Sequence, residues 1–129
     1  MDNKLAFDAW VETGNLEFAS KVLAKRGYVN PLRNMPWEPS TVRKAAERWI
    51  LDNPEEARKV YLANGSILNQ QQWEAKLVKL CCSKYSRSRF IQWVAKHPWA
   101  KNYPQIFERR WPGLCKFWGI DYVLDDASP

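Results

Sequence analysis

The chain has 129 residues, a hydrophobic share of 46% and a formal net charge of +6 at pH 7. A chain of this length can bury one modest core or two very small ones. It contains no apolar run of 18 or more residues and no signal-peptide pattern, so we expect a soluble, cytoplasmic protein without a membrane partner.

Apolar residues recur at three- and four-residue spacing along most of the chain, which predicts helices. No strand-like alternation appears, and residues 28–39, with three prolines, are expected to form a loop that Trp37 anchors to the core. The predicted helices span residues 4–12, 16–26, 42–52, 54–63, 67–83, 85–98 and 102–110, and residues 114–124 are predicted as a short helix or an extended arm. The sequence therefore predicts an all-α fold, a small multi-helix domain with one or two helix-turn-helix-like units.

Small polar residues and glycine mark the predicted helix ends. Gly14 is expected to end the first helix, and Asn15 to cap the second with its side chain. Ser40-Thr41 are expected to cap the third helix in the same way, and Asn53 to cap the fourth.

The basic residues are concentrated in one part of the chain. Residues 1–65 are near neutral, whereas residues 66–118 hold ten Lys and Arg against two acidic residues, and five of the eight tryptophans. We therefore predict a near-neutral N-terminal helical unit (1–65), a basic Trp-rich helical unit (66–124) and an acidic frayed tail (125–129). Such a concentrated basic segment is typical of a protein that binds a polyanion.

Residues 85–98 (YSRSRFIQWVAKHP) are predicted to form one short helix with two distinct sides. Ser86 or Ser88 can cap it, and Pro98 prevents its continuation. The apolar side consists of Phe90, Trp93 and Val94. The neighbouring side consists of Arg89, Gln92 and Lys96. Two interpretations remain open, a helix that enters a DNA groove and an amphipathic surface helix whose basic side is simply solvated.

A weak internal repeat relates the two halves of the chain. In each half a basic helix carries a tryptophan followed by an aliphatic residue, with a proline four positions after that residue. The two copies are Trp49-Ile50-x-x-x-Pro54 and Trp93-Val94-x-x-x-Pro98.

Two segments carry a resemblance to a known class. Residues 9–19 (AWVETGNLEFA) resemble the opening of helix-turn-helix domains in phage small-terminase and transposase-like proteins, and residues 85–94 (YSRSRFIQWV) resemble their recognition helix. The resemblance implies binding in the major groove of DNA, a role in phage DNA packaging or transcription control, and a homo-oligomeric ring. Residues 28–39 are longer than the turn of that class, and Ser83 stands where it has a buried aliphatic residue.

The side chains predicted to contact nucleic acid follow from chemistry. Arg pairs with guanine and Gln with adenine from a helix in the major groove, while Lys and Arg neutralise phosphates. The helix at 85–98 supplies Arg87, Arg89, Gln92 and Lys96. The flanking phosphate contacts are predicted at Lys76, Lys79, Lys84, Lys101, Arg109 and Arg110. DNA is the expected partner, with RNA as the alternative polyanion.

Two other classes of function compete with DNA binding. A small phage-type interaction module, an inhibitor or adaptor of a host protein, would expose its tryptophans as a binding surface, so the burial of Trp73, Trp99 and Trp111 discriminates. An enzyme would need an acid–base pair, a metal-binding cluster or a phosphate loop, and the sequence offers none. We expect no enzyme activity and no cofactor or metal, with His97 at a helix end and the three cysteines as reduced, buried thiols.

Overall fold

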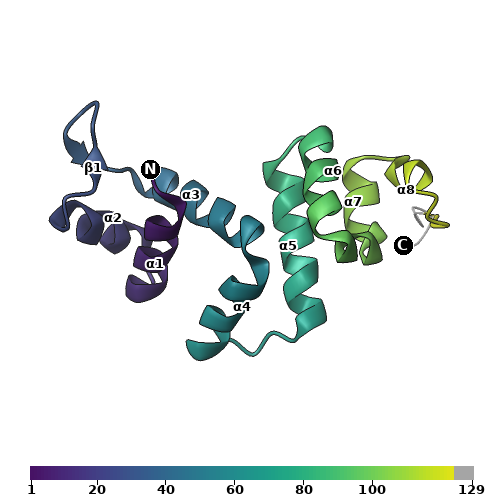
Figure 1. The fold of residues 1–129 in the computed structure, drawn as a ribbon, viewed down its shortest axis with the longest axis horizontal. Helices are drawn as coiled ribbons and strands as arrows, with labels where there is room; N and C mark the ends of the chain where they lie inside the picture. The colour runs from purple at the N-terminus through teal and green to yellow at the C-terminus, as the bar shows by residue number, and fades with distance from the viewer. Residues whose placement is uncertain (124–129) are drawn as a thin grey trace, which may run out of the picture. The chain divides into compact units, whose positions relative to one another are not determined.

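The computed structural model describes residues 1–123, and its regular structure is predominantly helical (Figure 1). Within those residues there are eight α-helices, one 3-10 helix and one hairpin of two very short strands, which confirms the predicted all-α fold. The chain divides into two compact units, unit 1 (Met1–Ser66) and unit 2 (Ile67–Pro129). The predicted acidic tail, residues 125–129, lies outside the described part. No helix that the structure describes is long and apolar enough to span a membrane.

Unit 1 is built from four helices and the hairpin. Its elements are α1 (Asn3–Thr13), α2 (Leu16–Lys25), β1 (Val29–Asn30), β2 (Met35–Pro36), α3 (Pro39–Asp52) and α4 (Pro54–Ala63). Helices α1 and α3 pack against each other, and the ring centroids of Phe7 and Trp49 lie 4.4 Å apart. Phe7, Leu23 and Val42 are fully buried, so the apolar stripes of α1, α2 and α3 form one small core.

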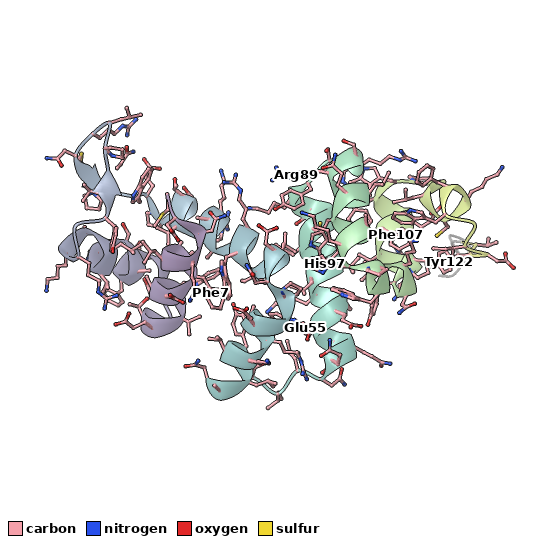
Figure 2. All side chains as sticks on the ribbon, in the orientation of Figure 1. Phe7, Glu55, Arg89, His97, Phe107 and Tyr122 are labelled. Carbon is pink, nitrogen blue, oxygen red and sulfur yellow. The ribbon has the colours of Figure 1, made fainter. Side chains whose placement is uncertain are left out.

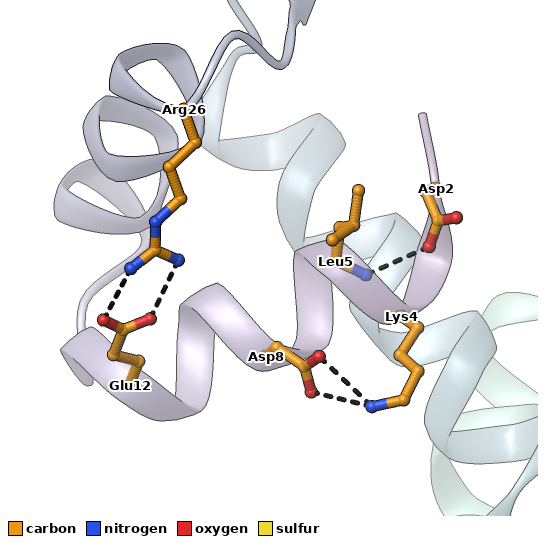
Figure 3. A network of polar contacts seen from close by, with 6 residues as sticks. All are labelled: Asp2, Lys4, Leu5, Asp8, Glu12 and Arg26. Carbon is orange, nitrogen blue, oxygen red and sulfur yellow. Dashed lines mark hydrogen bonds and ion pairs between the residues drawn. The ribbon is translucent and has the colours of Figure 1, made fainter.

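The corner between α1 and α2 follows the sequence prediction. Gly14 adopts a left-handed φ of 67° and donates its N–H to the Trp10 carbonyl at 2.8 Å, a conformation that favours glycine. Asn15 then caps α2, because its side-chain oxygen accepts the N–H groups of Glu17 and Phe18. On the surface, the Glu12 carboxylate and the Arg26 guanidinium form two parallel hydrogen bonds of 2.8 and 3.1 Å between these helices (Figure 3).

The predicted cap at Ser40-Thr41 is wrong, and the predicted cap at Asn53 is correct only in its position. Helix α3 begins at Pro39, ahead of Ser40-Thr41, because proline fits the first helical position, where its missing N–H has no partner to lose. Asn53 makes no side-chain cap to α4. Its Nδ2 instead donates to the Trp49 carbonyl at 3.1 Å, so that it completes the end of α3.

The predicted loop at residues 28–39 contains the hairpin. Val29 pairs with Pro36 and Asn30 with Met35, and strands of two residues are too short to show an alternating pattern. Trp37 is half-buried, and its carbonyl accepts a hydrogen bond from the buried Ser20 hydroxyl. The backbone and the ring of this tryptophan therefore both contribute to holding the loop.

Unit 2 contains α5 (Gln70–Lys84), α6 (Arg87–Lys96), the 3-10 helix η1 (Pro98–Asn102), α7 (Pro104–Arg110) and α8 (Leu114–Phe117). Helix α5 begins three residues later than predicted. Asn69 and Gln72 form a reciprocal capping box there, and Ile67 is left 95% exposed. Helix α8 covers only Leu114–Phe117 of the segment predicted at residues 114–124. Leu124 lies outside the described residues.

Residues that precede proline form four of the helix ends. Asn53, His97, Tyr103 and Trp111 have φ between −121° and −135° and ψ between 52° and 84°. Proline excludes the helical conformation from the residue before it, so each helix must stop there. The N–H of the residue still donates to a carbonyl of the turn that ends, as in Asn53 to Trp49 at 2.8 Å.

An aromatic cluster forms the core of unit 2. The ring of Phe90, which is fully buried, lies 5.1 Å from Trp111, 5.8 Å from Phe107, 6.0 Å from Trp93 and 6.2 Å from Trp118. The residues come from α6, α7 and the end of α8, so this cluster holds the C-terminal half of the unit together.

Phe90→Ala should destabilise unit 2 by about 3–5 kcal/mol, because it removes the central ring and leaves a cavity. Chemical unfolding followed by tryptophan fluorescence measures the change. The matched control is Phe18→Ala, because Phe18 is 56% exposed and should cost below about 1 kcal/mol. Equal losses in the two variants would show that the cluster is not the core of the unit.

Candidate nucleic-acid interface

Helix α6 has one buried and one exposed side, as the sequence predicted. Phe90, Trp93 and Val94 are buried. Ser86 caps the helix by accepting the Arg89 N–H at 3.3 Å. Arg89, which Figure 2 labels, belongs to the exposed side. The other side chains of that side are Arg87, Ser88, Gln92, Ala95 and Lys96.

Aromatic rings hold the arginines at the N-terminal end of α6. The guanidinium of Arg89 lies 4.2 Å from the ring centroid of Tyr85, and that of Arg87 lies 5.4 Å from the ring of Phe117. Such contacts restrict the side chain and leave the edge of the guanidinium, with its N–H donors, available. Within the described part of the chain neither arginine forms an ion pair.

The C-terminal end of α6 is fixed by packing and by a proline corner. His97 is the C-terminal cap, with its ring 5.1 Å from Trp93 and 5.9 Å from Trp99. This agrees with the prediction that His97 stands at a helix end. Lys96, one residue earlier, is exposed and lies in the last turn, where the helix dipole favours a positive charge.

The other predicted phosphate contacts fall into two groups. The first group lies near or beyond the ends of α6 in the chain. It consists of Lys84, which is half-buried at the end of α5, and of the exposed Lys101 and Arg110. Lys101 and Arg110 lie over the rings of Trp118 and Trp111, at 5.5 and 5.1 Å. The second group, Lys76, Lys79 and Arg109, lines a groove of about 610 Å³ between α5 and α7.

Sequence reasoning missed four lining residues of this groove, Gln72, Ala75, Gln105 and Ile106. On α5 the signal was present, because positions 72, 76 and 79 recur at helical spacing. The contribution of α7 could not be read in the same way, because the packing of α7 on α5 depends on the whole unit.

Both carboxylates of the basic segment are used internally. Glu74 accepts hydrogen bonds from the Tyr103 hydroxyl at 2.6 Å and from Gln70 at 3.0 Å. Burial, together with this bond to Glu74, raises the pKa of Tyr103 to about 12. Glu108 accepts the backbone N–H groups of Gly113 at 2.6 Å and Cys115 at 2.9 Å, which lower its pKa. These two carboxylates therefore do not neutralise the basic side chains on the exposed side of α6.

The repeated motif has the same local geometry in both units. Trp49 and Trp93 each accept the N–H of the residue before the proline, and Asn53 and His97 share a φ of −133°. The surfaces nevertheless differ in charge. In α3 the position that corresponds to Arg89 is Ala45, which is buried. Of these two helices, therefore, only α6 presents the exposed stripe of Arg89, Gln92 and Lys96, which we call the Arg–Gln–Lys stripe.

The tryptophans that discriminate between the classes of function are covered to different degrees. Trp73 is 2% exposed, and Trp99 and Trp111 are half-buried. No tryptophan is among the exposed large hydrophobic residues of the described chain, and of these three only Trp73 belongs to the buried core.

Cys81, Cys82 and Cys115 are free and buried, as predicted, and burial raises the pKa of Cys82 and of Cys115 to about 12. Over residues 1–123, no group of three or more His, Cys, Asp or Glu side chains is arranged to hold a metal ion.

Comparisons of the chain with models of protein families, with curated proteins and with solved structures found no match. The case for a function therefore depends on the geometry of α6 and its surroundings.

Glu108→Gln should destabilise unit 2 at pH 7 by about 1 kcal/mol, because a charged acceptor of two backbone N–H groups is replaced by a neutral one. The folded-state pKa of Glu108 lies below its ordinary value of 4.5. Its stabilising contribution is thus complete above pH 4.5 and is lost as the pH falls through the lower folded value.

Unfolding curves at pH 7 and at successively lower pH measure this loss. The difference between wild type and Glu108→Gln should shrink below pH 4.5. Glu56→Gln, at an exposed position, should cost less and serves as the control. A difference that stayed constant with pH would show that the charge of Glu108 is not what holds α8.

Proposed function

We propose that this protein binds duplex DNA through unit 2, with α6 in the major groove. The observation that carries the proposal is the exposed stripe of Arg89, Gln92 and Lys96 on a capped helix whose opposite side is fixed in an aromatic core. A rigidly held helix can present side chains to base edges in a constant register.

The size and chemistry of α6 suit the groove. Its 10 residues make a rod of about 15 Å, and the major groove of B-DNA is about 12 Å wide. Arg89 can donate two hydrogen bonds to guanine, and Gln92 can pair with adenine through its amide. Both stand in the N-terminal two-thirds of the helix, the part that commonly reaches base edges when such a helix docks.

Cations around α6 would hold the phosphates. We assign this role to Lys84, Arg87, Lys96, Lys101 and Arg110. We no longer assign it to Lys76, Lys79 and Arg109, because they line a separate groove between α5 and α7. Of these, Arg87, Lys101 and Arg110 are exposed and oriented by aromatic contacts. Each phosphate that a cation neutralises releases counterions from DNA, and this supplies affinity that does not depend on sequence. The sequence resemblance to small-terminase and transposase-like proteins supports the same function, and packaging or transcription control remains a proposal that rests on it.

Arg89→Ala should cost roughly 1–3 kcal/mol at one base position and relax the preference for guanine there. Selection from a randomised duplex library, followed by affinity measurement on the selected site, tests this. Lys25→Ala is the matched control, because Lys25 is an exposed lysine on α2. If Arg89→Ala and Lys25→Ala leave the selected sequences identical, α6 does not read bases.

Affinity for duplex DNA should fall steeply with salt, with a log–log slope of about −0.9 for each phosphate neutralised. Lys101→Ala should reduce the magnitude of the slope by about 1 and weaken all sequences alike. Titrations with duplex DNA, single-stranded DNA and RNA at several salt concentrations measure this. A slope near zero, or tighter binding to RNA than to duplex DNA, would contradict the proposal, and a stoichiometric complex with a host protein would favour the interaction module.

A further inference from the structure

The groove between α5 and α7 gathers positive charge on one side of two packed helices. Lys76 and Lys79 line it from α5 and Arg109 from α7, and none of its lining residues is acidic. Lys79 and Arg109 are exposed, and within residues 1–123 neither forms an ion pair. Bringing like charges together costs free energy, so this arrangement favours a negatively charged occupant.

Part of the groove lining is apolar, so the groove offers more than a site for an anion. Ala75 and Ile106 line it as half-buried apolar residues, while Gln72 and Gln105 line it as exposed amides. The groove has a volume of about 610 Å³. A phosphate group would leave Ala75 and Ile106 uncovered, whereas apolar side chains between acidic ones would cover them.

We propose that this groove docks an acidic amphipathic helix of a partner protein. Apolar residues of the partner at i and i+4 would contact Ala75 and Ile106, and its Asp or Glu residues would pair with Lys79 and Arg109. Binding of an amphipathic helix in a groove of its partner is a recurring mode of peptide recognition. The acidic flanks set orientation and exclude basic competitors, and the apolar contacts supply most of the affinity.

The proposal goes beyond DNA binding and does not depend on it. All lining residues come from α5 and α7, and none comes from α6. The groove and the Arg–Gln–Lys stripe thus use different side chains, so a partner protein and DNA are recognised by separate sets of residues.

The test is selection of helical peptides from a display library, using the full chain as bait. The enriched peptides should combine apolar residues at i and i+4 with flanking Asp and Glu. Their binding should weaken at least tenfold in the double variant Lys79→Glu/Arg109→Glu. Both positions are exposed, and an unchanged helical circular dichroism spectrum confirms folding. Peptides with Lys in place of their acidic residues should regain affinity for this variant.

A matched variant, Lys96→Glu/Lys101→Glu, has the same change of charge outside the groove and should keep peptide affinity within about twofold. Enriched peptides without acidic residues, or equal losses in the two double variants, would overturn the proposal. So would displacement of the peptide by duplex DNA together with loss of DNA affinity on Lys79→Glu, because the groove would then hold phosphates. Failure of DNA binding alone, with peptide binding retained, would contradict only the proposed function.

Discussion

The packing of Phe90 against its aromatic neighbours is the interaction on which unit 2 depends. The ring of Phe90 contacts Trp111, Phe107 and Trp118, which lie on or beyond α7 in the chain. It therefore joins α6 to the C-terminal part of the unit. Burial of these rings fixes which side of α6 faces outward. The same contact that stabilises the unit thereby determines that Arg89, Gln92 and Lys96 are exposed.

Proline corners supply the second constraint. Four helices end just before a residue that precedes proline, namely Asn53, His97, Tyr103 or Trp111. At the first three of these corners the next helix begins at the proline itself. Because proline removes both the helical conformation before it and one N–H, these ends are fixed by covalent structure. In unit 2 three such corners follow α6 closely, so the chain turns back repeatedly and covers one side of that helix. Short elements and sharp corners let a small unit enclose an aromatic core.

Local sequence signals predicted those features that local chemistry decides. Gly14 and Asn15 mark the α1–α2 corner correctly, and Pro54 correctly marks the start of α4. Predictions were wrong where a second local option was better. Helix α3 begins at Pro39, before its predicted cap. Helix α5 begins later than predicted, directly after the capping box at Asn69.

Tertiary packing decided what the sequence did not reveal. The exposed stripe of α6 was predictable from spacing alone, because burial of Phe90 and Trp93 leaves Arg89 outside. The groove at Lys79 and Arg109 was not, because 30 positions separate its two sides and their meeting depends on how α7 packs on α5. The sequence shows how many Lys and Arg residues the unit contains, but it does not show which of them lie side by side in the fold.

The central claim is that the outer side of α6 is the surface that meets DNA. Titration of the ¹⁵N-labelled protein with duplex DNA, followed by NMR, tests it most directly, because each amide reports its own surroundings. The account predicts that the largest shift changes fall at Ser88, Arg89, Gln92 and Lys96, with the groove residues Lys79 and Ile106 unaffected. Changes confined to unit 1, or changes at the groove with α6 silent, would contradict it.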